Sequence, residues 1–152
     1  MKTIKKTILL LAFATATLFT SCSKSDPTPA VVTPPAATVV DGFTWTENGG
    51  TTVMTVDNPY ANIQGKTIFA VRSGNTIYEI NLSSLAVGSY PVTNGVNVIT
   101  YVPNANGFFN ATSDSIIITV NANNKLSGTF TGAGSGNGIT SVSGQFTNIP
   151  IQ

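Results

Sequence analysis

The sequence predicts an all-β fold, namely a single antiparallel β-sandwich or flattened β-barrel of about nine or ten short strands. Three observations support this class. Apolar and polar residues alternate in several runs, as they do in half-buried strands. Clusters of Gly, Asn and Ser interrupt these runs about every ten residues, as hairpin turns do in a sandwich or barrel. No segment keeps the spacing of apolar residues that an amphipathic helix needs.

The alternation is clearest in four runs, in which β-branched and aromatic residues dominate. These runs are residues 66–72, 75–81, 114–120 and 126–131. Six further strands are expected, at residues 42–46, 51–56, 60–64, 88–92, 96–102 and 139–149. The glycine-rich segment Gly132–Gly138 predicts a flexible hairpin loop.

The last of these strands carries an irregularity. After Phe146 the alternation changes phase, because Ile149 and Ile151 fall on the opposite parity. A phase change of this kind requires an extra residue in the strand or the end of its pairing. We therefore expect a β-bulge near Asn148 or an edge strand that ends at Pro150.

The start of the chain has the features of an export signal. Lysines precede an apolar run at residues 8–19, and the small residues Thr20 and Ser21 precede the only cysteine, Cys22. The apolar run is too short for a transmembrane helix, which needs roughly 20 residues. The arrangement resembles a bacterial lipoprotein signal. This resemblance implies that residues 1–21 are removed and that Cys22 carries the lipid, which would anchor the protein to a membrane without spanning it.

The composition changes again after the cysteine. Residues 22–38 contain four prolines among Thr, Ala and Val, which predicts an extended linker. Residues 39–152 have a normal size for one hydrophobic core and should form the all-β domain. Ser23 does not resemble the Asp that retains lipoproteins in the inner membrane, so we expect the outer membrane. Residues 23–26 resemble the acidic surface-export signal of Bacteroidota lipoproteins only in part, which leaves the periplasmic and the cell-surface side open.

Charge limits the classes of partner. Three of the seven lysines and arginines lie in the predicted signal, so the rest of the chain carries four of them against six carboxylates. No basic cluster remains outside the signal. A protein that binds nucleic acid needs clustered Lys and Arg to displace counterions from the phosphates. We therefore expect no nucleic-acid partner.

The residue types also limit catalysis. The chain has no histidine, and its single cysteine is predicted to be lipidated, which excludes Ser-His-Asp, Cys-His and histidine–metal sites. A hydrolase with a pair of carboxylates stays open. Such carboxylates are more often solvated charges at strand ends, and Asp and Asn are ordinary turn formers rather than calcium ligands. We therefore predict a non-enzymatic protein without cofactor or metal. The carboxylates of the domain are Asp41, Glu47, Asp57, Glu79 and Asp114.

Aromatic side chains are the candidates for ligand binding. Phe108 and Phe109 follow a polar turn, and consecutive residues of a strand point to opposite faces, so one ring should lie outside the core. Exposed rings among Asn and Thr are typical of sugar binding, although a ring that covers the end of a sheet is the simpler alternative. The candidate set is Trp45, Tyr78, Tyr101, Phe108 and Phe109. It favours a binding module for a glycan or small ligand, with docking to another envelope protein as the alternative.

Two resemblances complete the sequence analysis. The segments 126–130 and 142–150, with the turn 88–90 and a later strand at Tyr101, resemble a family of small Bacteroidota lipoproteins whose domain has no assigned function. This resemblance implies an exported all-β domain with no known catalytic residue and no cofactor. Asp114-Ser115-Ile116 resembles the acceptor triplet for O-glycosylation of exported Bacteroidota proteins, which makes Ser115 a candidate modification site.

Overall fold

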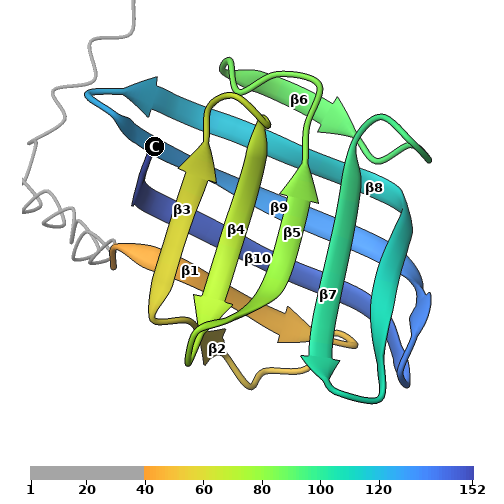
Figure 1. Ribbon diagram of the computed structural model, residues 1–152. Coiled ribbons are helices and arrows are strands. Elements are labelled where there is room, and N and C mark those ends of the chain that lie inside the picture. The colour runs from red at the N-terminus through yellow and green to blue at the C-terminus, as the bar shows by residue number, and fades with distance from the viewer. Residues whose placement is uncertain (1–39) are drawn as a thin grey trace, which may run out of the picture. The chain divides into compact units, whose positions relative to one another are not determined.

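A computed structural model describes residues 40–152, which form ten β-strands and, within this range, no helix (Figure 1). The predicted all-β class is thus confirmed. The predicted signal, Cys22 and the whole of the predicted linker lie outside the described residues. The strands are β1 (Gly42–Glu47), β2 (Met54–Thr55), β3 (Asn58–Asn62), β4 (Thr67–Arg72), β5 (Asn75–Asn81), β6 (Gly88–Pro91), β7 (Val98–Asn104), β8 (Gly107–Ala122), β9 (Lys125–Gly136) and β10 (Ile139–Pro150).

All strands belong to one antiparallel sheet with the order β2-β1-β10-β9-β8-β7-β5-β4-β3, and β6 pairs with β8 beside this path. The sheet is strongly curled, so that β3, β4, β5 and β7 form one layer and cross obliquely over the layer of β1, β10, β9 and β8 (Figure 1). The inner faces of the two layers enclose the core. Sequential strands are mostly hairpin neighbours, as the regular turn signals predict.

The edge strand β3 meets the chain just beyond β10 at one corner of the sheet. Ala61 of β3 forms a parallel bridge with Ile151, just beyond β10. The Ile63 amide donates to the Gln152 carbonyl at 2.9 Å, and the Gln152 amide donates to the Ala61 carbonyl at 2.8 Å. The fold is therefore a flattened barrel that is closed along part of its seam.

Two strands are much longer than predicted. β8 has 16 residues where seven are predicted, and β9 has 12 where six are predicted. The predicted loop Gly132–Gly138 is wrong, because β9 continues to Gly136 and the turn consists of Asn137 and Gly138, both with positive φ. The glycines serve close packing: a Cβ at Gly134 or Gly136 would collide with the backbone of β8. By contrast, the strand predicted at residues 51–56 is reduced to the two residues of β2.

The predicted bulge near Asn148 is confirmed. The register of β10 against β9 shifts between Phe146 and Ile149, and Asn148 has a φ of 50°. Its amide donates to the Ser127 hydroxyl at 2.9 Å instead of to a backbone carbonyl. The extra residue restores Ile149 to the buried face, which explains the change of parity in the sequence.

A repeated Ser-Gly-X-Phe string shapes the centre of the sheet. In the antiparallel register of β9 and β10, Phe130 lies opposite Gly144, and Phe146 lies opposite Gly128. A Cβ at either glycine would collide with the opposite ring, so each glycine provides the space that the ring occupies. The two phenylalanines are almost completely buried.

Candidate functional site

The five aromatic residues that the sequence proposed for ligand binding do not form one surface. Trp45, Tyr78, Tyr101 and Phe109 are each at most 3% exposed and belong to the core. Only Phe108 is open to solvent, with 58% of its surface exposed, because it points to the opposite face of β8 from Phe109. We therefore correct the candidate set: the four buried rings leave no face on which a surface-bound sugar could stack.

Three of these rings nevertheless lie together inside the barrel. Tyr78 of β5 and Tyr101 of β7 are directly opposed, and their rings stack at a centroid distance of 4.4 Å and an interplanar angle of 8°. Trp45 meets both edge-on, at 5.1 Å from Tyr78 and 5.6 Å from Tyr101. Arg72 covers this group, with its guanidinium carbon 5.1 Å from the centre of the Trp45 ring.

One hydroxyl of this aromatic group is hydrogen-bonded to a carboxylate. The Tyr101 hydroxyl donates to Glu47 Oε1 at 2.5 Å. Burial and the hydrogen bond to Glu47 raise the pKa of Tyr101. The nearby Trp45 indole N–H lowers this pKa, although the geometry of its contact does not meet the criteria of a hydrogen bond. Burial, followed by the nearby Tyr101 hydroxyl and Glu47 carboxylate, raises the pKa of Tyr78 still further. Both tyrosines are therefore neutral across the physiological range.

Most carboxylates of the domain accept hydrogen bonds from local partners. Asp41 accepts from the Asn148 side-chain amide at 2.8 Å, Asp57 from the Ser73 backbone amide at 3.0 Å, and Glu79 from the Asn81 side-chain amide at 2.9 Å. Among residues 40–152, no group of three or more His, Cys, Asp or Glu side chains is placed to hold a metal ion.

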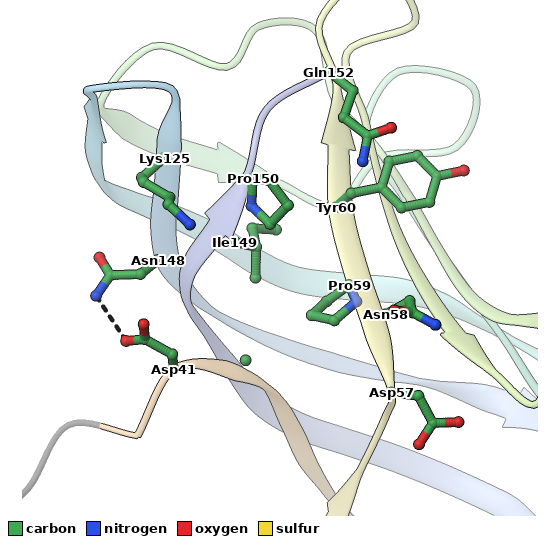
Figure 2. Close-up of a pocket in the computed structure, with 11 residues that line it drawn as sticks. Asp41, Asp57, Asn58, Pro59, Tyr60, Lys125, Asn148, Ile149, Pro150 and Gln152 are labelled. Carbon is green, nitrogen blue, oxygen red and sulfur yellow. Dashed lines mark hydrogen bonds between the residues drawn. The ribbon is translucent and has the colours of Figure 1, made fainter.

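One hollow lies where β3 faces the ends of β1 and β10 (Figure 2). It has a volume of about 350 Å³, and its lining carries charges of both signs. Asp41 and Asn148, joined by their hydrogen bond, lie on one side, and Asp57 lies on the other side at the start of β3 (Figure 2). The two carboxylates therefore do not converge. The lining residues are Asp41, Gly42, Asp57, Asn58, Pro59, Tyr60, Lys125, Asn148, Ile149, Pro150 and Gln152.

A second hollow of about 530 Å³ lies between the β4–β5 and β7–β8 turns. Ile77 and Val102 supply apolar surface, and Asn75 and Asn104 supply amides. Its only charged lining residue, Arg72, already donates to the Thr55 carbonyl at 2.7 Å and covers the aromatic group.

A third hollow, of about 700 Å³, runs over the outer face of β1, β10 and β9. We call it the hydroxyl groove. Outward side chains of neighbouring strands align in rows here: Thr46, Ser143 and Thr131 in one row, and Thr44, Gln145 and Thr129 in the next. No Lys, Arg, Asp or Glu lines it. The lining residues are Val40, Thr44, Trp45, Thr46, Val53, Thr55, Thr129, Phe130, Thr131, Ser143, Gly144 and Gln145.

The sequence contains a pattern that indicates this groove, but the prediction of binding residues considered only aromatic side chains. β1 and β9 each carry a Thr-X-Thr triplet, and β10 carries Ser-X-Gln, with the middle residue of each triplet facing inward. Alternation alone shows that these polar side chains share one face of each strand. It does not show that the three strands are neighbours, which depends on the pairing of β1 with the distant β10.

Ser115, the candidate for glycosylation, is half-buried within β8. It is paired with Thr131 of β9 on one side and with Pro91 of β6 on the other. The preceding Asp114 has a φ of 80°, and its carbonyl accepts from the Val92 amide at 2.8 Å. The acceptor triplet is thus part of a paired strand rather than a loop, and modification of Ser115 stays a prediction.

Comparisons with known proteins add no relative. Neither the protein-family models, nor the curated proteins, nor the solved structures contain a match to the chain. Within residues 40–152, no helix is long and apolar enough to cross a membrane. The geometry of the described residues is therefore the basis for any proposal about function.

Proposed function

We propose that this chain is a lipid-anchored protein of the outer membrane whose β domain binds an uncharged glycan in the hydroxyl groove, without catalysis. The observation that carries the proposal is the composition of the groove. Its polar lining consists of hydroxyl and amide side chains from neighbouring strands, and none of its lining residues is ionisable. The predicted lipoprotein signal supplies the anchor, and the prolines of residues 22–38 supply the spacing from the membrane.

The chemistry of the groove fits a sugar better than an ion. Thr, Ser and Gln side chains each donate and accept hydrogen bonds, as sugar hydroxyls do. Threonine methyl groups and the side chains of Val40 and Val53 add apolar surface for the C–H faces of a sugar ring. The volume of about 700 Å³ lies in the range of small-molecule sites. An anionic ligand would find no cationic partner in the groove.

The proposal is tested by comparing uncharged with anionic oligosaccharides on a glycan array, followed by calorimetry with the purified protein. The informative variant is Thr129→Glu, which places a charge in the groove. The matched control is Thr112→Glu, since Thr112 is also an exposed strand threonine but lies outside the groove. We expect Thr129→Glu to weaken binding at least tenfold, or about 1.4 kcal/mol, and the control to bind normally. Equal affinities of the two variants would contradict the site.

Docking to another envelope protein is a second candidate. Phe108 is exposed on the outer face of β8, near Val102 of β7, which is also partly exposed. Exposed apolar side chains of this kind contribute to protein interfaces. If the array finds no glycan for the wild type or for Phe108→Ala, we expect a specific envelope protein to co-purify with the wild type after mild extraction. Phe108→Ala should abolish this co-purification.

A further inference from the structure

A group of aromatic and polar side chains lies in the interior of the barrel, and of its members only Trp45 also lines the hydroxyl groove. Glu47 follows Trp45 by two residues on β1, so both side chains point to the same face of the strand. The stacked rings of Tyr78 and Tyr101 approach from the opposite layer. The Tyr101 hydroxyl donates to Glu47, and the Tyr78 ring lies parallel to the Tyr101 ring with its centre 4.4 Å away.

Two polar atoms of this group have no hydrogen-bond partner among the described residues. They are the Trp45 indole nitrogen and the Tyr78 hydroxyl, and both residues are at least 99% buried. A buried donor without a partner is costly, and native proteins almost always provide one, often as an internal water. The two rings contact each other edge-on with their centres 5.1 Å apart, so we consider one small molecule as the partner of both atoms.

The donor and acceptor properties of the surrounding groups define the chemistry of that partner. The indole N–H only donates, so the partner needs a lone pair, which a metal or ammonium cation lacks. The Glu47 carboxylate only accepts, so the partner must also carry a proton to donate, which most anions do not. The tyrosine hydroxyl fits either role. A neutral molecule with both functions satisfies all three groups, and water is the smallest one.

We propose that Trp45, Tyr78 and Glu47 hold one ordered water molecule inside the barrel. The water accepts a hydrogen bond from the Trp45 indole N–H and forms a hydrogen bond with the Tyr78 hydroxyl, which can donate or accept. It donates to the Glu47 carboxylate, whose Oε1 also accepts from Tyr101. Arg72 closes the site toward solvent, since its guanidinium covers Trp45 and is tied to the Thr55 carbonyl at 2.7 Å.

A crystal structure of the protein at a resolution that shows ordered water decides the question. We expect density within about 3.2 Å of both the Trp45 nitrogen and the Tyr78 oxygen. The absence of such density in a well-ordered core would overturn the proposal.

A pair of variants tests the same site in solution. Removal of a hydroxyl that has no partner should raise the melting temperature, whereas removal of a hydroxyl that binds a water should lower it. We expect Tyr78→Phe to lower the melting temperature relative to Tyr60→Phe, because Tyr60 lies on β3 outside the buried group. A melting temperature of Tyr78→Phe at or above that of the control would speak against the water.

Discussion

At the scale of single residues, the orientation of a side chain decides whether it serves packing or binding. Phe108 and Phe109 are adjacent and chemically identical, yet one is 58% exposed and the other is fully buried. The alternation of a strand requires this difference but does not say which ring is inside. The answer comes from the pairing of Phe109 with Tyr101, which faces the core. The prediction from the sequence therefore kept both rings as candidates for binding, and Phe109 is a core ring.

The same pair provides a matched test of the packing. We expect Phe109→Ala to lower the free energy of unfolding by about 3–5 kcal/mol, because it removes a fully buried ring and leaves a cavity. Phe108→Ala should change it by no more than about 0.5 kcal/mol. Urea unfolding followed by the fluorescence of Trp45, the only tryptophan, measures both. Similar losses in the two variants would mean that the assignment of the inner ring is wrong.

The ionisation of the buried tyrosines predicts how stability depends on pH. Burial and Glu47 raise the pKa of Tyr101, and burial raises that of Tyr78, whereas both side chains ionise near pH 10 once unfolded. The unfolded chain therefore loses protons first, and stability is complete below about pH 10 and declines above it. We expect thermal melts to show this alkaline decline, and Tyr101→Phe to reduce its slope. A wild-type stability that is flat well above pH 10 would contradict the raised values.

At the scale of elements, the sequence predicted the number and order of strands well, because alternation and turn residues are local signals. Seven of the ten observed strands overlap their predicted ranges by most of their length, β8 and β9 overlap them by half of their length or less, and β2 overlaps by two residues. The extension of β9 through Gly134 and Gly136 had no such signal, since glycine lacks strand propensity. These glycines are explained only by the nearby backbone of β8. The hydroxyl groove was missed for the same reason, because its rows depend on which strands pair.

The glycine–phenylalanine pairs of β9 and β10 give a prediction at this scale. A Cβ at Gly144 would collide with the Thr44 carbonyl of β1 and with the Phe130 ring of β9. We expect Gly144→Ala to lower the free energy of unfolding by at least about 1–3 kcal/mol, the usual cost of overpacking. The neighbouring Gln145→Ala, at an exposed position of the same strand, is the control. Chemical denaturation of both variants measures the difference. If Gly144→Ala had the denaturation midpoint of the wild type, the neighbouring strands would make room for the Cβ at no cost, and the prediction would be wrong.

At the scale of the whole molecule, the closure of the barrel could not be predicted from the sequence. The choice between sandwich and barrel rests on contacts between Ala61 and the last two residues, which are about 90 positions apart in the chain. Such contacts leave no local pattern. The proposed membrane anchor is the opposite case, because its prediction depends only on the local order of a basic start, an apolar run and Cys22.

The proposed anchor is tested by replacing Cys22, the residue that we propose carries the lipid. We expect the wild-type protein to enter the detergent phase on phase partitioning and the Cys22→Ala protein to stay in the aqueous phase. The physical reason is that each buried methylene of an acyl chain contributes about 0.8 kcal/mol to membrane binding, whereas the β domain has a surface dominated by polar side chains. Ser23→Ala, which leaves the cysteine in place, should partition like the wild type. If wild type and Cys22→Ala both remained in the aqueous phase, the protein would have no lipid anchor, and the outer-membrane location that we propose would have to be abandoned.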